Sequence, residues 1–361
     1  LWFLPLGGCG EIGMNLNLYG HAGRWLMVDC GVTFAKPGED GPHVQMPDPA
    51  FIVERRDALA ALLVTHAHED HLGAVAHLWP RLRCPVYATP FAAEILRRKL
   101  VEKRLVDRVP VRVVAPGERF ELEGFDIEWI SITHSTPESQ ALVIRTAAGT
   151  VFHSGDWKLD DDPVVGPVSD RDKLQALADE SVAAMVCDST NALVEGESVS
   201  EGTLVEGLND LGAHAPGRVV VGCFGSTIAR LETLVRVATE NGRYAGLLGR
   251  SLQNYHAAAV AAGVWDPELR LVEPAHLGYL PRHEVLAIAT GSQGELRAAL
   301  DRLSSDTQRD LNLEPGDTVI LSSRVIPGNE ASVESLMLRL KSFAVDAVSY
   351  THLTLPTSFL V

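Results

Sequence analysis

The chain lacks any uninterrupted apolar run near the ~20 residues that a membrane-spanning helix needs, and no charged-then-apolar leader opens it. Only five cysteines occur among 361 residues, and none of them forms a C-x-x-C pair. Scattered cysteines of this kind are typical of buried free thiols in a reducing compartment. The composition therefore predicts a soluble, cytoplasmic protein and disfavours a membrane protein or a disulfide-stabilised secreted one.

Basic residues are too few for a protein that binds nucleic acid by charge alone. The 31 Lys and Arg residues stand against 47 Asp and Glu residues, which gives a formal net charge of -16. A generic electrostatic nucleic-acid binder is disfavoured, because its affinity comes from many cationic contacts to phosphates. A local site stays open, since bound divalent ions add positive charge where a formal count sees only carboxylates.

The length and the 46% hydrophobic content predict two domains, or one domain with a large insertion. In the first half, short apolar segments read as strands, and residues 142–150 are one of them. Further on, strand and helix alternate: 218–223 is followed by a helix over 227–239, and 285–289 by a helix over 294–303. Such alternation predicts parallel βαβ units, so we expect an α/β layered core with a second α/β region inserted into it.

The densest group of metal ligands is the run H-A-H-E-D-H at residues 66–71. In an extended backbone, His66 and His68 project to one side, whereas Asp70 and His71 fall where the chain turns into a helix and can serve a second ion. A polar strand-to-helix turn with incidental histidines is the alternative. Imidazole and carboxylate groups side by side suit Zn or Mn, and favour the metal site.

Two isolated residues at strand ends complete this site. His134 and Asp156 each follow an apolar segment, where a single His or Asp is commonly only a turn residue. Asp29 also ends an apolar segment, and we expect it to orient a ligand histidine, with a simple turn aspartate as the alternative. Two ions about 3.5 to 4 Å apart can hold a bridging hydroxide and perform hydrolysis. The predicted ligands are His66, His68 and His134 on one ion and Asp70 and His71 on the other, with Asp156 as the bridge.

These ligand positions match the pattern of the metallo-β-lactamase superfamily, which includes small-molecule hydrolases and nucleases. Additional motifs resemble those of bacterial ribonuclease J, and the similarity runs from the first residues to about Ala347. The motifs are G-G-C-G-E-I-G-M-N (7–15), H-S-G-D-W-K-L-D (153–160), C-D-S-T-N (187–191), F-G-S-T-I-A-R-L (224–231), G-R-S (249–251), A-T-G-S-Q-G-E (289–295) and S-S-R-V-I-P-G-N-E (322–330).

The resemblance implies a metallo-β-lactamase αββα sandwich core over 1–187, interrupted by an inserted β-CASP α/β domain over 188–347. It implies a metal-dependent ribonuclease, both 5′-3′ exoribonuclease and endoribonuclease, that acts in rRNA processing and mRNA decay. The implied cofactors are two divalent ions, with zinc favoured and manganese or magnesium as alternatives. The implied partners are single-stranded RNA, preferably with a 5′-monophosphate, and further copies of the chain in a homodimer or homotetramer.

The resemblance also assigns roles to individual residues. Asp188 falls on the first acidic motif of the β-CASP domain, and the nucleotide-contacting segments contain hydroxyls and cations suited to phosphates. The expected catalytic residues are Asp70, His71 and Asp156, and the expected RNA-binding residues are Ser226, Arg230, Arg250, Ser251 and Ser292.

The sequence departs from the family after Ala347. The family continues with an H-x-S-G-H-A segment that supplies a further metal ligand, and the surroundings of His352 do not match it. We expect a C-terminally truncated chain whose residues 348–361 are a non-native tail; a genuine divergent C-terminus is the alternative. Such a chain would lack the dimerisation region, have a weakened second metal site and, as one expectation, be inactive through truncation.

Two other functions stay open. A small-molecule thioester or lactone hydrolase of the same superfamily would share the ligands, but it would not need the region after residue 188. A non-catalytic RNA-binding scaffold would suit a chain that had lost a ligand.

Overall fold

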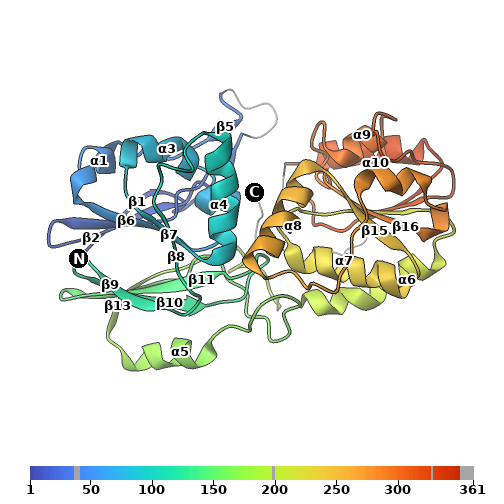
Figure 1. Cartoon of the computed structure of the whole chain (residues 1–361). Coiled ribbons are helices and arrows are strands. Elements are labelled where there is room, and N and C mark those ends of the chain that lie inside the picture. The colour runs from blue at the N-terminus through green and yellow to red at the C-terminus, as the bar shows by residue number, and fades with distance from the viewer. Residues whose placement is uncertain (36–40, 197–199, 327, 350–361) are drawn as a thin grey trace. The chain divides into compact units, whose positions relative to one another are not determined.

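The computed structural model describes residues 1–35, 41–196, 200–326 and 328–349, which divide into two compact units (Figure 1). The first unit holds residues 1–161 and 166–196, and the second holds 162–165 with the described residues from 200 onward. Across the described part of the chain, no helix has both the length and the apolar character to cross a membrane.

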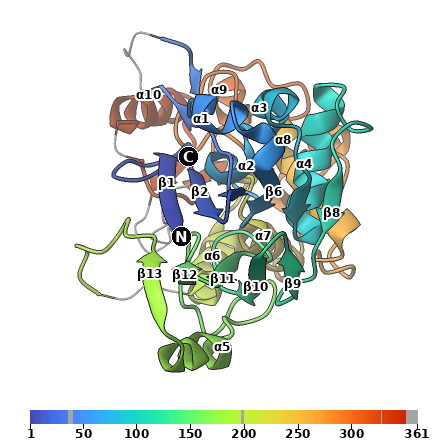
Figure 2. The same cartoon turned by 90° about the vertical axis from the view of Figure 1, so that its left-hand side faces the viewer.

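Two facing sheets form the first unit (Figure 2). One sheet has the order β1 (Trp2–Gly7), β2 (Leu16–His21), β3 (Arg24–Val28), β6 (Leu59–Val64), β7 (Val86–Ala88) and β8 (Val111–Val113). The other has the order β13 (Val182–Val186), β12 (Gly149–His153), β11 (Gln140–Thr146), β10 (Phe125–Ser131) and β9 (Arg119–Leu122). A two-stranded ribbon, β4 (Thr33–Phe34) with β5 (Val44–Gln45), accompanies them.

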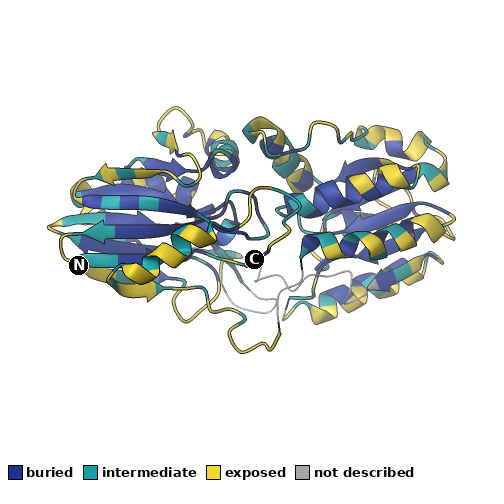
Figure 3. Cartoon of the chain, turned by 90° about the horizontal axis from the view of Figure 1, so that it is seen from below, coloured by how far each residue is buried: buried dark blue, intermediate teal, exposed yellow. Residues whose placement is uncertain are grey.

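The burial of each strand follows from its place in the sandwich (Figure 3). β6 is buried at all six positions, because parallel strands flank it and both of its faces are covered. β10 alternates buried and half-buried residues from Phe125 to Trp129, as expected of a strand with one face toward the core, and Ile130 is buried in a second cluster. Tyr19 and Leu63 from one sheet join Trp129 and Leu142 from the other in a single buried cluster.

Helices cover the outer faces of both sheets (Figure 1). The arrangement confirms the predicted αββα sandwich, in which helix, sheet, sheet and helix are stacked. The helical elements of this unit are α1 (Ala50–Val53), η1 (Arg56–Ala58), α2 (Glu69–Leu72), α3 (Val75–Leu82), α4 (Pro90–Glu102), α5 (Arg171–Ala176) and η2 (Leu177–Asp179).

One strand prediction in this unit is wrong. The segment expected as a single strand over 142–150 is divided between β11 and β12, which pair antiparallel through a two-residue turn at 147–148. Gly149 has a φ of +137° at this turn. The turn residues are two alanines, so the segment lacks the Asn-Gly or Asp-Gly signal by which a hairpin is read from sequence.

A parallel sheet with helices forms the second unit, confirming the predicted βαβ units. Its order is β15 (Tyr244–Leu248), β16 (Val285–Ala289), β14 (Val219–Gly222), β17 (Thr318–Leu321) and β18 (Asp346–Ser349). Its helical elements are η3 (Glu201–Thr203), α6 (Leu204–His214), α7 (Ile228–Glu240), α8 (Arg250–Ala262), η4 (Pro274–Tyr279), η5 (Arg282–Glu284), α9 (Ala299–Leu303) and α10 (Glu330–Lys341).

The helix expected over 294–303 is shorter than predicted, because α9 starts only at Ala299. Gly294 and Arg297 have φ values of +76° and +64°, which no right-handed helix contains. The spacing of apolar residues in the sequence does not reveal such left-handed backbone positions.

The end of the described chain bears on the predicted tail. Val348 belongs to β18, which pairs with β17, and only 7% of its surface is exposed. Residues 350–361, including His352, lie outside the described residues, so their assignment as a non-native tail stays a prediction. The domain limits 1–187 and 188–347 also stay a prediction; among the described residues, the first compact unit runs to residue 196 and the second continues from residue 200.

Candidate metal centre

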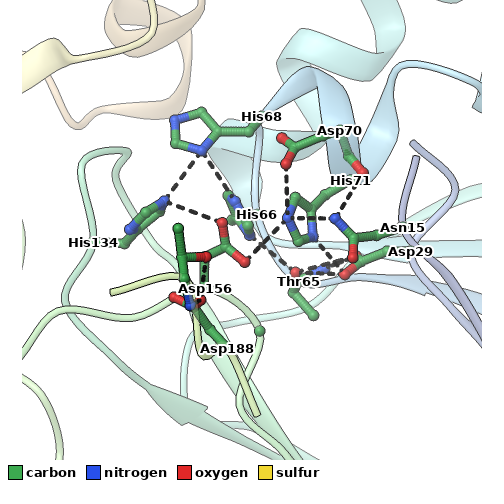
Figure 4. Close-up of polar contacts among 12 residues, drawn as sticks. Asn15, Asp29, Thr65, His66, His68, Asp70, His71, His134, Asp156 and Asp188 are labelled. Carbon is green, nitrogen blue, oxygen red and sulfur yellow. Dashed lines mark hydrogen bonds and ion pairs between the residues drawn. The ribbon is translucent and has the colours of Figure 1, made fainter. Parts of the chain in front are cut away.

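Imidazoles and carboxylates of the first unit gather where β6 ends (Figure 4). His66 lies in a bend just after the strand, His68 follows in extended conformation, and α2 then starts, so that Asp70 and His71 lie in its first turn. Each of these four residues is at most 3% exposed. The carboxyl end of a parallel strand is a common place for ligand-binding side chains.

Three ring nitrogens converge in the first ligand group, which consists of His66, His68 and His134. Nδ1 of His68 lies 3.1 Å from Nε2 of His66 and 3.2 Å from Nε2 of His134. A tetrahedral zinc ion with Zn–N bonds of 2.0–2.1 Å separates its ligand nitrogens by about 3.3 Å. The observed spacing therefore fits a metal ion coordinated by all three rings.

The second ligand group consists of His66, His71 and Asp156, and the carboxylate of Asp70 lies beside His71. Nε2 of His71 lies 3.3 Å from Oδ1 of Asp156 and 3.5 Å from Oδ2 of Asp70. Asp156 also approaches the first group, with Oδ2 at 3.9 Å from Nε2 of His134. Oδ1 of Asp70 is buried without a hydrogen-bond partner in the described chain. A buried, unmatched carboxylate oxygen is costly unless a cation lies beside it, so this group also fits a divalent ion.

The ionisation of the histidines suits metal binding in the first group. Burial lowers the pKa of His134 to about 4, against the opposing charge of Asp156. Burial and the neighbouring histidines also hold the pKa values of His66 and His68 well below the ordinary value. These three rings are neutral at pH 7, and a neutral imidazole is the form that binds a metal.

His71 is in a different electrostatic environment. Burial would lower its pKa, but the carboxylates of Asp156, Asp70 and Asp29 outweigh burial and raise it well above the ordinary value. Burial would likewise raise the pKa of Asp156, but the charge of His71 and the other nearby histidines lowers it. The second group is thus built to hold positive charge.

Asp29 contacts one ligand histidine, His71, and the role of orienting it stays a prediction. Asp29 is fully buried after β3, with a φ of +62°. Its carboxylate accepts hydrogen bonds from Nδ1 of His71 at 2.7 Å and from the backbone N–H of Thr65 at 2.8 Å. The adjoining Gly31 allows close packing, since a Cβ there would lie 1.6 Å from the carbonyl oxygen of Asp70.

Three residues near the site were missed by sequence reasoning. The amide Nδ2 of Asn15 lies 3.1 Å from Nε2 of His71, and the Thr65 hydroxyl bonds the Asp29 carboxylate. Oη of Tyr19 lies 2.9 Å from Nδ1 of His153 in the core. Asparagine, threonine and tyrosine in apolar surroundings have no metal-ligand spacing, and only proximity in the fold distinguishes them.

Asp188 lies two residues beyond the end of β13 (Figure 4). Its Oδ1 accepts hydrogen bonds from the backbone and the hydroxyl of Thr190, and its own N–H donates to the hydroxyl of Ser154. Ser154 neighbours the segment that carries Asp156. The structure thus places Asp188 in the first unit, linked to the metal-site loop through its backbone.

Several of the expected RNA-binding residues lie at the carboxyl ends of strands in the second unit. Arg250 and Ser251 follow β15 and line a pocket of about 600 Å³ with Thr290, Glu295 and Arg297. Arg250 and Ser251 are exposed, and in the described chain their side chains have no hydrogen-bond partner. The pocket therefore offers free hydrogen-bond donors to a ligand.

The other three expected RNA-binding residues are less accessible. Ser226 is half-buried after β14, whereas Ser292 is 2% exposed after β16. Arg230 is 4% exposed; its guanidinium pairs with Glu201 and donates to the carbonyl oxygen of Ser322 at 2.7 Å. Because the charge of Arg230 is neutralised inside the unit, its structural role is to join η3, α7 and the end of β17.

Comparisons with known proteins assign both parts of the chain. A sequence model of the ribonuclease J β-CASP domain matches residues 216–340, and one of the β-lactamase superfamily domain matches residues 24–174. A crystal structure of a protein of unknown function from Enterococcus faecalis V583 matches 98% of this chain and 87% of its own, with a TM-score of 0.65 and 16% identity. At that identity the likeness shows the fold alone.

Curated relatives are closer in sequence. Ribonuclease J of Sinorhizobium meliloti is 44% identical over 340 residues, which cover 93% of this chain and 60% of the relative. Ribonuclease J of Mycolicibacterium smegmatis is 39% identical over 350 residues, 95% of this chain and 62% of the relative. Ribonuclease J of Helicobacter pylori strain J99 is 36% identical over 335 residues, which cover 92% of this chain and 48% of the relative. The chain thus spans about half to three fifths of the length of these relatives.

Proposed function

The chain belongs to the ribonuclease J family, as its motifs predicted, and on that premise we propose that it is a metal-dependent ribonuclease that hydrolyses RNA phosphodiesters. The observation that carries the proposal is the convergence of two largely buried ligand groups at the end of β6, one of His66, His68 and His134 and one of His66, His71 and Asp156. Their nitrogen spacing suits a metal ion, and one oxygen of Asp70 is otherwise unsatisfied.

Each ligand residue has a defined part in this proposal. His66, His68 and His134 hold one divalent ion, Asp70 and His71 hold a second, and Asp156 lies between the two groups. When bound, such ions polarise a phosphoryl oxygen and lower the pKa of water. Asp29 holds the proton on Nδ1 of His71, which keeps Nε2 directed toward Asp156 and Asp70. Zinc is favoured by the three imidazoles of the first group, with manganese or magnesium as alternatives.

Single-stranded RNA is the substrate that suits the second unit. Phosphate binding needs donors without internal partners, and Arg250 and Ser251 provide them beside the pocket after β15. Arg297 adds another cation to the same pocket. We propose that these residues bind the RNA backbone, with Ser226 and Ser292 as hydroxyls of neighbouring loops. Arg230 is left out because Glu201 already neutralises it.

Finer features of the activity follow from the family. We propose cleavage both from the 5′ end and internally, a preference for a 5′-monophosphate, a role in rRNA processing and mRNA decay in the cytoplasm, and self-association as a homodimer or homotetramer. The negative net charge of -16 is compatible with this substrate, since the ions concentrate positive charge at the site itself.

The test is metal-dependent cleavage of an end-labelled, single-stranded 5′-monophosphate RNA. Asp70→Ala should reduce the rate by more than about 100-fold, because loss of a ligand exceeds the 10–100-fold typical of residues behind ligands. Asp161→Ala is the matched control, since this carboxylate is 79% exposed in the same unit and should leave the rate unchanged.

Three outcomes would contradict the proposal. Asp70→Ala with a normal rate would remove the assigned role of the ligands. Turnover of a thioester or lactone without RNA cleavage would favour the small-molecule hydrolase. RNA binding without cleavage by the metal-loaded chain would favour the scaffold.

A further inference from the structure

The hydroxyl of Thr65 lies between the Asp29 carboxylate and the ring of His66. Its Oγ1 is 2.9 Å from Oδ2 and 3.1 Å from Oδ1 of Asp29, and 3.0 Å from Nδ1 of His66. Asp29 and Thr65 are fully buried, and His66 is 1% exposed. The three groups therefore bond one another and not water.

The direction of these hydrogen bonds follows from a count of protons. An ionised carboxylate only accepts, so the single hydroxyl proton of Thr65 is donated to Asp29. Toward His66 the hydroxyl oxygen can then only accept, which requires the proton of this neutral ring to be on Nδ1. Nε2 of His66 is left with its lone pair, and it is this atom that faces Nδ1 of His68 at 3.1 Å.

The same carboxylate acts on the second ligand group without an intermediary. Oδ2 of Asp29 accepts from Nδ1 of His71 at 2.7 Å, which leaves Nε2 of His71 facing Asp156 at 3.3 Å. We propose that Thr65 is a positioning residue through which Asp29 fixes the tautomer of His66, so that one buried carboxylate prepares a histidine in each ligand group for metal. The metal-binding part of this inference rests on the proposed function.

A purely structural role for Thr65 makes a different prediction. Its backbone N–H donates to Oδ1 of Asp29, and its carbonyl accepts from the N–H of Gln140. Both bonds survive any side-chain substitution. Its Cβ also limits the space beside Gly155, where an added Cβ would lie 3.3 Å away. If only shape and packing mattered, valine would replace threonine without effect, since the two side chains have the same branching.

The experiment compares Thr65→Val, which keeps the shape, with Thr65→Ser, which keeps the hydroxyl. In the whole chain, Zn²⁺ and Mn²⁺ affinity is measured by competition with a chelator. The Val variant should bind the first ion 10–100-fold more weakly, the range typical of lost hydrogen bonds behind metal ligands. The Ser variant should remain close to the unsubstituted protein. Equal affinity of the Val variant, or a Ser variant as weak as Val, would overturn the proposal.

A second measurement does not depend on metal or RNA. In the metal-free protein, long-range ¹⁵N NMR correlations of the histidine rings report which nitrogen carries the proton. His66 should be protonated at Nδ1 in the unsubstituted protein and in the Ser variant, and it should lose this preference in the Val variant. If His66 keeps the Nδ1 proton in the Val variant, Thr65 does not set the tautomer. A protein that binds no divalent ion would refute the proposed function, while the NMR result would still decide the role of Thr65.

Discussion

Asp29→Asn is the substitution that most directly tests how the metal centre is organised. The variant keeps the shape of the side chain but replaces one carboxylate oxygen with an NH₂ group. The backbone N–H of Thr65, 2.8 Å from Oδ1, requires an acceptor, so the amide oxygen is held there. The new NH₂ group then faces Nδ1 of His71, which is 2.7 Å from Oδ2. The new NH₂ group and the N–H at Nδ1 of His71 are both hydrogen-bond donors, and they repel each other at 2.7 Å.

The conflict is relieved when Nδ1 of His71 gives up its proton and accepts from the new amide. The neutral ring then keeps its proton on Nε2, the nitrogen beside Asp70 and Asp156, and this nitrogen can no longer bind a metal ion. We expect a 10–100-fold loss of affinity for the second ion, equivalent to about 1.4–2.8 kcal/mol. The free energy of unfolding should also fall by about 1.5–3 kcal/mol, because a hydrogen bond to a charged group is lost.

Metal affinity by chelator competition and unfolding by urea test both expectations. Asp317→Asn is the matched control, because Asp317 is also fully buried and accepts from the backbone N–H groups of Arg218 and Glu314 at 2.8 and 2.9 Å. It lies in the second unit. The control should lose stability and keep its metal affinity. An Asp29→Asn variant with unchanged affinity, or with a loss that Asp317→Asn reproduces, would refute the reasoning.

Four further predictions concern other parts of the chain. Arg230→Met should lower the free energy of unfolding by about 3–5 kcal/mol in urea titrations, because it leaves a buried carboxylate unpaired. Arg250→Ala should leave stability unchanged but weaken RNA binding and reduce its salt slope by about 1 in filter-binding assays. Gly31→Ala should abolish binding of the second ion, measured by elemental analysis, because its Cβ would lie 1.6 Å from the carbonyl of Asp70. His153→Gln should flatten the acid dependence of stability. Burial lowers the pKa of His153 from 6.5 to about 4, so the unfolded chain takes up a proton before the native protein does as the pH falls. The free energy of unfolding of the unsubstituted protein should therefore fall by about 2 kcal/mol between pH 7 and pH 5. An equal dependence of this free energy on pH in both proteins would contradict the prediction.

Much of the fold could be predicted from the sequence, because its signals are local. The apolar strands β14 and β16 and the helix α7 follow from short apolar runs and helical periodicity, and parallel pairing follows from the alternation of strand and helix. The hairpin between β11 and β12 and the late start of α9 could not be predicted. Both depend on single backbone positions with positive φ, at Gly149 and at Arg297, which the hydrophobic pattern does not reveal.

For the metal centre, the sequence determined the residue types. Metal ligands need particular side chains at particular spacings, and this requirement identifies the dense run at 66–71 and the strand-end residues His134 and Asp156. Only the tertiary structure decided how they are supported. The bonds from Asp29 to Thr65 and His71 join residues 36 and 42 positions apart. The tertiary structure also determined which of two arginines is available to a ligand, since Arg230 is neutralised by Glu201 and Arg250 is exposed. Hydrogen-bond partners and burial arise from packing between distant segments, and therefore no local pattern in the chain encodes them.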